Sequence, residues 1–565
     1  VAAQLYYRLR DGAPDAQAAL LALESRLGDA EAGDRAVQAE YARQSSGNVT
    51  VGNIIRSLRR MGDIDWLDWF ESVSAVDMLL ARHTEFDRLD QPTRASYRST
   101  LERIARRSSL TEIEVAHRAI EQGRADAAAA EDRGQAPGAG GGHLEGARVE
   151  VGHLLVGDHR RSFREACGYR PTLLERLSIP LRKAGLWLIA MPLVGITAVL
   201  VALLGYALPA QLPGWQLVAL LALVMLPASD TAMQVVSFLA ARTIPPSRLP
   251  AYDFREGVPA QFRTLVVIPG MITSMDAIDE LAEMLESHYL ANPLGEVSFA
   301  LLTDWRDAPA ETLPEDARLL AHARARIDDL ADRYDHGGIR RFFLLHRRRL
   351  WNPAEGVWMG WERKRGKLAE LNLLLRGVEN TSFVPTGPTP PEGIRYVMTL
   401  DSDTRLPRDT VAALVGKMAH PVNRPVHAES GVVIRGHGIM QPRVTPSLTT
   451  GPEASVFQRI FSVNRGLDPY VFTVSDLYQD LADEGSFTGK GIYDVDAFER
   501  AVAGRIAENA VLSHDLLEGC LARSALVTDI EVVEDFPVRY ATEASRQHRW
   551  TRGDWQLLPW IFNLS

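Results

Sequence analysis

The chain has 565 residues, of which 46% are hydrophobic and 24% are charged, and this composition excludes wholesale disorder and a collagen-like or mucin-like repeat. Its 62 basic and 72 acidic residues give a net charge of −10, which argues against a general nucleic-acid-binding protein. Only Cys167 and Cys520 are present, without a CxxC motif or a Cys/His cluster, which argues against a disulfide scaffold and a structural zinc site.

The first residue is Val, and no signal peptide follows it. We therefore expect the chain to be a piece of a longer protein. Residues 1–122 are predicted to be helical, because apolar positions recur at helical spacing through 51–61 and 66–80. Ser109 and Glu112 form a predicted capping box. We expect this region to be a packing or partner-binding module without chemistry, and residues 123–143, rich in Ala and Gly, to be a flexible linker.

Two long apolar runs follow a basic juxtamembrane segment at 144–183. Residues 184–208 carry no charge, and residues 215–241 are interrupted by Asp230 and a few small polar residues. Each run can cross a hydrocarbon core of ~30 Å, so 184–243 is predicted to be a transmembrane hairpin. Because Arg and Lys lie outside the hairpin and not in its turn, both flanks are predicted to be cytoplasmic. The alternative is a buried helical hairpin in a soluble protein.

Residues 244–565 alternate between short apolar strands and helical segments, which predicts an α/β domain with a mostly parallel sheet. In such a sheet, ligands bind beyond the carboxyl ends of the strands. The predicted strands are 265–268, ending at a Pro-Gly loop, 297–302 and 396–400, and the predicted helices are 276–286, 317–334 and 364–375.

Acidic residues follow two of these strands. Asp304 follows the second strand, and Asp401 and Asp403 follow the third. Two carboxylates at this spacing can share a divalent cation that neutralises a diphosphate. Lys364 and Lys367 at a predicted helix start suit an anionic substrate, and the alternative is an exposed basic helix face. A glycine-rich loop at 485–491 is not a Walker loop, because Gly follows its lysine. Taken singly, each of these features is better explained as structural.

The order of these elements resembles that of processive, membrane-embedded GT-A glycosyltransferases, and most of the chain resembles the glycosyltransferase portion of cyclic β-1,2-glucan synthases. The fold implied is a Rossmann-like GT-A domain with a transmembrane hairpin and an N-terminal helical region. The resemblance is carried by LPAYDFREGVP (249–259), VVIPGM (266–271), ERKRGKLAELN (362–372), MTLDSDT (398–404), GSFTGKGIYDVDAF (485–498), LSHDLLEG (512–519), RQHRWTRGDWQ (546–556) and the N-terminal stretch 47–74.

The resemblance implies a UDP-sugar donor site. Pro269 and Asp304 would hold the uridine, and Asp401 and Asp403 would hold Mg²⁺ or Mn²⁺ against the UDP phosphates, with Asp403 the more direct ligand. The metal would stabilise charge on the departing diphosphate. Lys367 would add a second positive charge near those phosphates.

The resemblance also implies an acceptor side of the site. Asp515 would be the general base that takes the proton of the acceptor hydroxyl, and Glu518 is the second candidate for that role. Arg549 would contact the diphosphate and Trp550 would offer an aromatic face to the acceptor sugar. The acceptor channel would be lined by Gly489, Lys490 and Gly491.

One motif departs from the family pattern. The last motif usually has Gln, two residues, and then Arg-Trp, but here the first position is Arg546 and Gln547 comes one residue late. Gln547 cannot simply take the usual role of that glutamine.

The function implied is an inverting, metal-dependent glucosyltransferase that uses UDP-glucose to extend a β-1,2-glucan, in a multi-pass protein of the bacterial inner membrane with its catalytic domain in the cytoplasm. Further domains are expected beyond residue 565, and cyclisation is not supported by this chain. The alternatives are another UDP-sugar or linkage, and a non-catalytic membrane scaffold with a degenerate transferase fold. A transporter would need more membrane spans.

Overall fold

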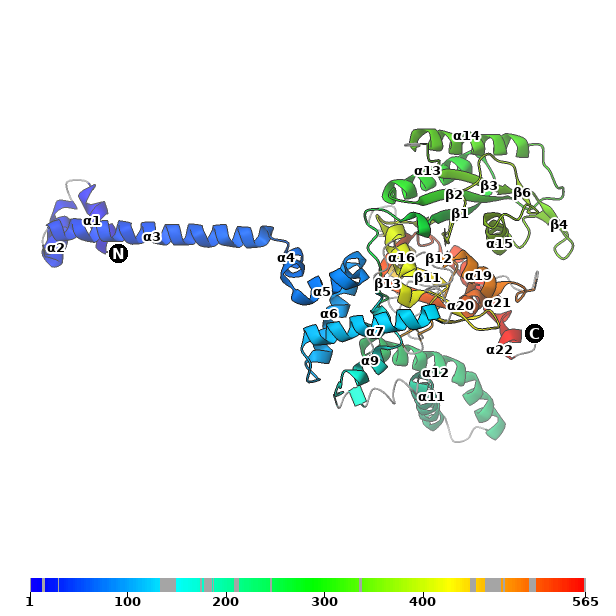
Figure 1. The fold of residues 1–565 in the computed structure, drawn as a ribbon, viewed down its shortest axis with the longest axis horizontal. Helices are drawn as coiled ribbons and strands as arrows, with labels where there is room; N and C mark the ends of the chain where they lie inside the picture. Colours follow the sequence, from blue (N-terminus) through cyan, green and yellow to red (C-terminus); the bar gives the residue numbers. More distant parts are fainter. Residues whose placement is uncertain are drawn as a thin grey trace. The chain divides into compact units, whose positions relative to one another are not determined.

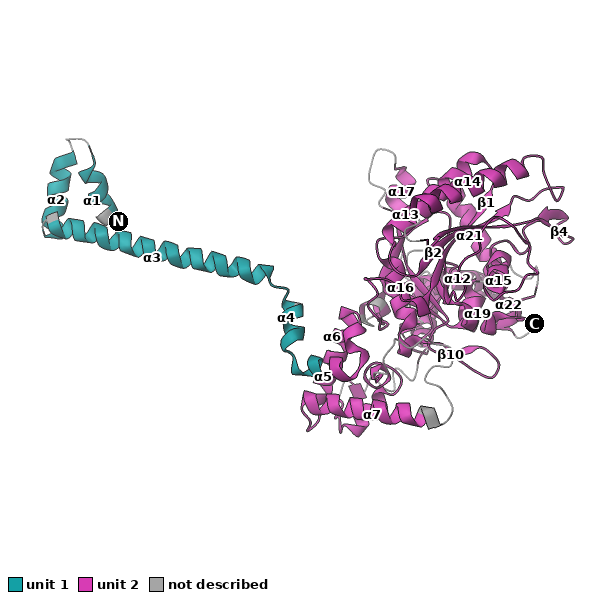
Figure 2. Cartoon of the chain, turned by 45° about the horizontal axis from the view of Figure 1, so that its top comes forward, with its two compact units in different colours: residues 1–78 teal, residues 79–565 magenta. Residues whose placement is uncertain are grey.

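The computed structural model divides the chain into two compact units, residues 1–78 and 79–565, which are coloured separately in Figure 2. Each unit is described here by itself. The described residues are 2–12, 16–28, 30–132, 149–172, 175–176, 185, 187–207, 213–243, 246–334, 338–447, 454–462, 479–480, 483–507 and 515–562.

Unit 1 is entirely helical where it is described. Its helices are α1 (Ala2–Arg10), α2 (Gln17–Leu27), the long α3 (Ala30–Asp63) and α4 (Trp66–Val73), and α5 (Ala75–His83) begins in it. Tyr6 is buried against α3, where a side chain at Gly33 would lie 2.5 Å from its ring, and its hydroxyl donates to Glu24 at 3.1 Å. The helical spacing predicted for 51–61 is confirmed, as is the helical character of the N-terminal region.

The first part of unit 2 is also helical, with η2 (Glu85–Arg88), α6 (Gln91–Ala105), α7 (Glu112–Asp132), α8 (Gly152–Leu155) and α9 (Arg160–Ala166). The capping box predicted for Ser109 and Glu112 is wrong by two residues. Thr111 accepts from the backbone N–H of Glu114 at 3.3 Å, and Glu114 accepts from that of Thr111 at 2.7 Å. The α7 helix continues through Asp132 into the expected linker, because Ala127–Ala130 favour helix strongly. The rest of that linker lies outside the described residues.

Two apolar helices follow, α11 (Trp187–Ala207) and α12 (Gly214–Thr243). Within the described part of the chain, these two are long and apolar enough to cross a membrane, with mean hydropathies of 2.5 and 1.6. They pack against each other through Ile189 and Val236. The sequence expectation of two apolar helices is therefore confirmed, and most of the expected turn lies outside the described residues.

A large mixed sheet forms the centre of the remaining chain (Figure 1). Among the described residues it has nine strands in the order β6-β3-β2-β1-β7-β12-β11-β13-β8, and β3, β2, β1 and β7 are parallel. This confirms the predicted α/β class with a parallel-rich sheet. The strands are β1 (Thr264–Ile272), β2 (Val297–Trp305), β3 (Phe342–Arg347), β6 (Phe383–Val384), β7 (Tyr396–Thr399), β8 (Thr404–Arg405), β11 (Ile439–Pro446), β12 (Gly491–Asp494) and β13 (Ser524–Glu534).

Helices cover both faces of the parallel strands. Figure 1 shows α13 (Met275–Ala291) and α14 (Asp316–Tyr334) on one side, where Tyr289 packs edge-on against Phe299 of β2. On the other face, α15 (Arg363–Leu375) and α19 (Val495–Val502) share a core with Leu265 and Val267 of β1. Alternate side chains of each strand thus face opposite helical layers, which explains why these strands are apolar throughout.

The remaining elements are shorter or lie around the sheet. They are η3 (Ala260–Phe262), β4 (Leu350–Asn352), β5 (Val357–Met359), α16 (Thr410–Ala419), η4 (Pro421–Asn423), β9 (Val426–His427), β10 (Val433–Arg435), α17 (Val456–Phe461), α20 (Asp515–Ala522), α21 (Tyr540–Trp555) and α22 (Leu558–Ile561).

The predicted helices agree with α13, α14 and α15 to within a few residues, but the first strand is longer than predicted. A strand ending at Ile268 was expected, whereas β1 continues through Pro269 to Ile272. Pro269 is opposite Leu302 and Gly270 is opposite Thr303, so the parallel partner β2 keeps the chain extended. This neighbour comes from a distant part of the sequence, and local turn propensity does not reveal it.

The buried His288 of α13 gives a prediction about acid stability. Burial lowers the pKa of His288 to about 4, while its Nε2 lies 3.1 Å from the carbonyl oxygen of Thr404. Because the unfolded chain binds a proton near pH 6.5, we expect stability to fall between pH 6.5 and 4, by up to ~1.4 kcal/mol per pH unit for this group. In His288→Gln, whose amide donates to the same carbonyl without ionising, the melting temperature should depend less on pH over this range. An unchanged slope would contradict the assignment.

Candidate active site

The three acidic residues predicted for the donor site come to one edge of the sheet. Asp304 is the penultimate residue of β2, and Asp401 and Asp403 follow β7. Both strands are parallel to β1, so their carboxyl ends meet at the same edge. Two lysines near the start of α15 contact these acids. Lys367 lies 3.0 Å from Asp304, and Lys364 lies 2.5 Å from Asp401.

Asp304 is the centre of a buried ion-pair group. Its carboxylate accepts from Arg347 Nε at 2.7 Å and Nη2 at 3.0 Å, and it pairs with Lys367, which also donates to the carbonyl of Gly270 at 2.9 Å. Burial acts to raise the pKa of Asp304, but Lys367 and Arg347 outweigh it and hold that pKa below its ordinary value. A side chain at Gly360 would lie 2.6 Å from this carboxylate, so the glycine makes room for it. Asp304 is therefore charged and rigidly held.

Arg347 also stabilises the backbone at the start of α15. Glu362 and Arg363, just before and at its first residue, both have left-handed backbones, with φ of 51° and 47°. This conformation costs of order 1–3 kcal/mol at each non-glycine residue. Arg347 offsets that cost by donating to the carbonyls of Trp361 at 3.0 Å and Arg363 at 3.1 Å. The buried guanidinium thus places Lys364 and Lys367 where they reach the two acids.

A third carboxylate joins the acids after β7. Glu534 ends β13, opposite Thr404 of β8, and one oxygen each of Asp401, Asp403 and Glu534 lie within 4.8 Å of one another. Sequence reasoning missed Glu534, which is the last residue of β13. We refer to these three residues as the acidic cluster.

Each member of the acidic cluster has a cationic partner. Lys490 lies 3.2 Å from Asp401 and 2.8 Å from Glu534, and Arg546 donates to Asp403 at 3.3 Å. Burial acts to raise the pKa of Asp401, but Lys364 and Lys490 lower it well below its ordinary value. Burial likewise acts to lower the pKa of Lys490, yet the two carboxylates hold it above the usual range. With Lys364, three cations balance three carboxylates.

The donor set of the acidic cluster fits a divalent cation. Three carboxylates supply the hard oxygen ligands that Mg²⁺ and Mn²⁺ prefer, and Asp401 and Asp403 are partly exposed to an incoming ion. A bound cation would take the place of ammonium and guanidinium groups on these oxygens. Asp401 and Asp403, the residues predicted to hold a divalent cation, could do so together with Glu534.

Gly489 lies between Asp515 and Lys364, the lysine that contacts Asp401 of the acidic cluster. Asp515 is the first residue of α20, and a side chain at Gly489 would lie 3.0 Å from both of its carboxylate oxygens. Gly489 has a φ of +87°, and its carbonyl accepts from Lys364 at 2.8 Å. Only glycine meets both the steric and the conformational requirement. One ammonium group thus connects Asp401 with the loop beside Asp515.

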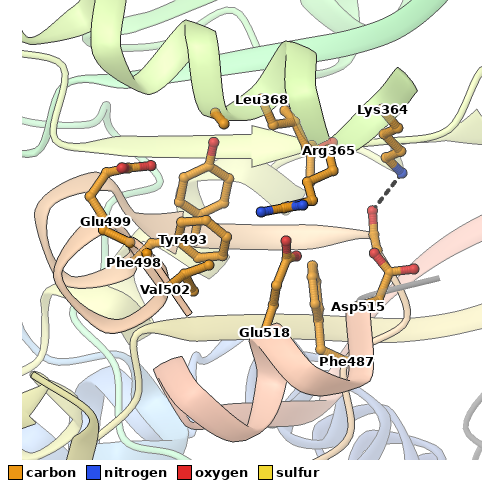
Figure 3. Close-up of a pocket in the computed structure, with 15 residues that line it drawn as sticks. Lys364, Arg365, Leu368, Phe487, Tyr493, Phe498, Glu499, Val502, Asp515 and Glu518 are labelled. Carbon is orange, nitrogen blue, oxygen red and sulfur yellow. Dashed lines mark hydrogen bonds between the residues drawn. The ribbon is translucent and has the colours of Figure 1, made fainter. Parts of the chain in front are cut away.

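A cavity of about 170 Å³ opens beside Asp515 (Figure 3). Phe487, Tyr493 and Phe498 form one part of its wall, and Asp515 and Glu518 supply carboxylates. The buried hydroxyl of Thr399 also lines it and has no hydrogen-bond partner among the described residues. Aromatic rings with a few polar groups suit a sugar ring, which has apolar faces and hydroxyls at its edge. Gly489 lines this cavity, whereas Lys490 and Gly491 do not.

The last motif lies on α21 and is arranged differently from the family pattern. Arg546, at the position where glutamine is usual, reaches Asp403, and its guanidinium lies 5.7 Å from the centre of the Trp550 ring. Trp550 packs in a small cluster around Phe536. Arg549 is exposed, and no hydrogen bond or ion pair joins it to another described residue. Gln547 donates to Glu543 on the same helix.

The structure brings most of the predicted site residues together and leaves others outside this group. Those at the acidic cluster and its edge of the sheet are Asp304, Lys367, Asp401, Asp403, Lys490, Gly489 and Asp515. Pro269 lies within β1 beside this edge, Gly491 begins β12, and the exposed side chain of Arg549 makes no contact with the acids. The roles assigned to all of these residues stay predictions.

Comparison with known proteins supports the resemblance seen in the sequence. No family model matches the chain. The chain is 53% identical over 569 residues to the cyclic β-(1,2)-glucan synthase NdvB of Rhizobium meliloti (strain 1021), and this match covers 99% of the chain. It spans only 20% of the length of that relative. The resemblance to cyclic β-1,2-glucan synthases is thereby confirmed.

Two solved structures resemble the chain more distantly. A mannosyltransferase from Pyrobaculum calidifontis in complex with GDP-Man and Mn²⁺ is 14% identical, with 57% of this chain and 70% of that chain covered and a TM-score of 0.28. S. aureus TarS is 12% identical, with 48% and 37% covered and a TM-score of 0.24.

The cationic partners of the acidic cluster give a prediction about metal affinity. In Lys490→Met, two carboxylates lose a competing cation, and one positive charge near the ion is removed. We expect Mn²⁺ to bind roughly tenfold more tightly to this variant in isothermal titration calorimetry, because charges a few Å apart interact strongly in a partly buried site. Asp403→Asn should weaken binding.

Arg333→Met provides the control, since Arg333 makes its ion pairs on the surface of α14. Unchanged or weaker Mn²⁺ binding in Lys490→Met would show that the acidic cluster is not the cation site.

Proposed function

We propose that this chain is the glycosyltransferase part of a membrane-anchored synthase, transferring glucose from UDP-glucose to a growing β-1,2-glucan with inversion at the anomeric carbon. The observation that carries the proposal is the Lys364 bridge, which brings the acidic cluster and Asp515 together in a chain 53% identical to a cyclic β-(1,2)-glucan synthase. A degenerate fold kept only as a scaffold has no physical need for these neighbouring carboxylates and their balanced cations.

The donor side of the reaction uses the acidic cluster. Asp401, Asp403 and Glu534 would hold Mg²⁺ or Mn²⁺, and the ion would supply positive charge to the leaving diphosphate. When the carboxylates bind the ion, the side chains of Lys364 and Arg546 become available to phosphate oxygens. Asp304 and Pro269 would orient the uridine, and Arg347 and Lys367 keep the Asp304 carboxylate fixed for that purpose. Arg549, which is exposed, is a further candidate for the diphosphate.

The acceptor side uses Asp515 and the cavity. Asp515 would take the proton of the acceptor hydroxyl as that oxygen attacks the anomeric carbon, and Glu518 one turn further along α20 is the second candidate. A base on the side of the sugar opposite the leaving group gives a single displacement and therefore inversion. The wall of Phe487, Tyr493 and Phe498 would hold a sugar ring, and Trp550 would offer its face to the glucan.

The apolar helices support membrane attachment. We propose that α11 and α12 cross the bacterial inner membrane and that the catalytic domain is cytoplasmic, where UDP-sugars are available. Arg242 near the end of α12 and the basic residues of 160–176 lie on the same side of this hairpin, as the positive-inside rule requires.

Two substitutions test the proposed catalytic roles. Asp403→Ala removes a cation ligand and Asp515→Asn removes the base, so each should lower Mg²⁺-dependent release of UDP from UDP-glucose by at least about a hundredfold. The melting temperature should stay near that of the wild type, because both residues lie at the edge of the sheet. Asp496→Asn, on an exposed ion pair with Arg376, serves as the control and should keep full activity. Turnover close to wild type in either site variant would refute its role.

The donor and the linkage need a product analysis. Membranes that contain the chain, supplied with radiolabelled UDP-glucose, should yield glucan whose methylation analysis shows 1,2-linked glucose. Incorporation from another UDP-sugar, or another linkage, would replace this part of the proposal and leave the transferase reaction intact. Absence of any Mg²⁺-dependent UDP release would instead favour the scaffold alternative.

A further inference from the structure

Unit 1 carries an apolar stripe that none of its own helices covers. The stripe consists of two segments, residues 51–58 at the end of α3 and residues 66–73 of α4, which Figure 2 shows as consecutive helices. Groups of exposed large apolar side chains mark interaction sites on a protein surface. The side chains, each between 46% and 61% exposed, are Val51, Ile54, Ile55, Leu58, Trp66, Trp69, Phe70 and Val73.

The two segments of the stripe have the same spacing. In each, apolar residues stand at i, i+3, i+4 and i+7, so they form one face of their helix. The positions are also symmetric about Gly62. Leu58 and Trp66 are each four residues from it, and Val51 and Val73 are each eleven residues from it. The same holds for the two inner pairs, Ile55 with Trp69 and Ile54 with Phe70.

The charges of the two segments are opposite. Residues 49–62 contain Arg56, Arg59 and Arg60 and no acidic residue, whereas residues 63–73 contain four acidic residues and no basic one. The four apolar positions of each segment are thus symmetric about Gly62, and Arg56 and Arg59 mirror the acidic Asp68 and Asp65. A surface with these properties is complementary to a second copy of itself in the antiparallel direction.

A fold-back of α4 onto α3 would not use this symmetry. The α3 helix ends at Asp63 and α4 begins at Trp66, so a hairpin would be centred on residues 64–65 and would place Leu58 opposite Glu71. Gly62, the centre of the pattern, lies inside α3. The symmetric pairing is therefore available only between two chains.

We propose that the stripe is a two-fold interface between two copies of this chain. Residues 51–58 of one copy pack antiparallel against residues 66–73 of the other, and the reverse contact forms on the other side of the two-fold axis. The basic segment of each copy then faces the acidic segment of its partner. An anionic lipid surface is a poorer occupant, because four acidic residues accompany the apolar side chains of 63–73.

The first test measures the mass of the full chain in detergent micelles by light scattering. We expect the mass of two chains for the wild type, and at least a tenfold rise in the dimer dissociation constant for Leu58→Asp and for Trp69→Asp. Leu290→Asp is the matched control, since Leu290 is 58% exposed on α13 and Leu58 is 61% exposed on α3. The substituted residues are exposed within unit 1, so circular dichroism should show unchanged helix content.

The second test reverses the charges. A variant with Arg56, Arg59 and Arg60 changed to Glu has two acidic segments, and a variant with Asp65, Asp68 and Glu71 changed to Lys has two largely basic ones. Each should be monomeric alone, and an equimolar mixture should form heterodimers.

Three results would overturn the proposal. One is a monomeric wild type at tens of micromolar, and another is a dimer that persists in both apolar variants. The third is a monomer whose unit 1 stripe binds phosphatidylglycerol vesicles but not phosphatidylcholine vesicles, since this would assign the face to lipid. These results concern unit 1 and leave the proposed transferase function untouched.

Discussion

The ammonium group of Lys364 connects the parts of this site. It lies between a carboxylate that follows one parallel strand and a backbone carbonyl of the loop beside Asp515. Its position depends on the start of α15, which in turn depends on the buried guanidinium of Arg347. Arg347 is itself neutralised by Asp304. A single series of contacts through charged side chains thus extends from the interior of the sheet to the loop beside Asp515.

Charge balance is the second constraint on the site. Three carboxylates within 4.8 Å of one another repel strongly in a partly buried position, and three basic side chains offset this repulsion. The same cations are the groups that an anionic substrate would recruit. The arrangement therefore balances the charge of the three carboxylates within the protein itself. Lys490, which was expected to line a channel, is instead buried against these carboxylates.

The helical unit and the catalytic domain present different kinds of surface. The domain around the sheet buries its apolar side chains on both faces of the strands, whereas residues 51–58 and 66–73 leave eight large ones exposed. Exposed apolar residues in a symmetric pattern, with opposite charges on either side of a centre, favour association between identical chains.

The sequence by itself determined the class of fold, the two apolar helices, the helices α13 to α15 and the acids that follow β2 and β7. Each of these features is encoded locally, in hydrophobic periodicity or in a polar residue directly after an apolar run. The tertiary structure alone decided the length of β1, the roles of Glu534 and Arg546 as neighbours of the acids, and the engagement of Lys490 with them. Glu534 reaches Asp401 because β13 lies beside β8, and Arg546 reaches Asp403 across more than a hundred residues of sequence. Such neighbours depend on the order of strands in the sheet, which is set by the packing of the whole domain and not by any local pattern.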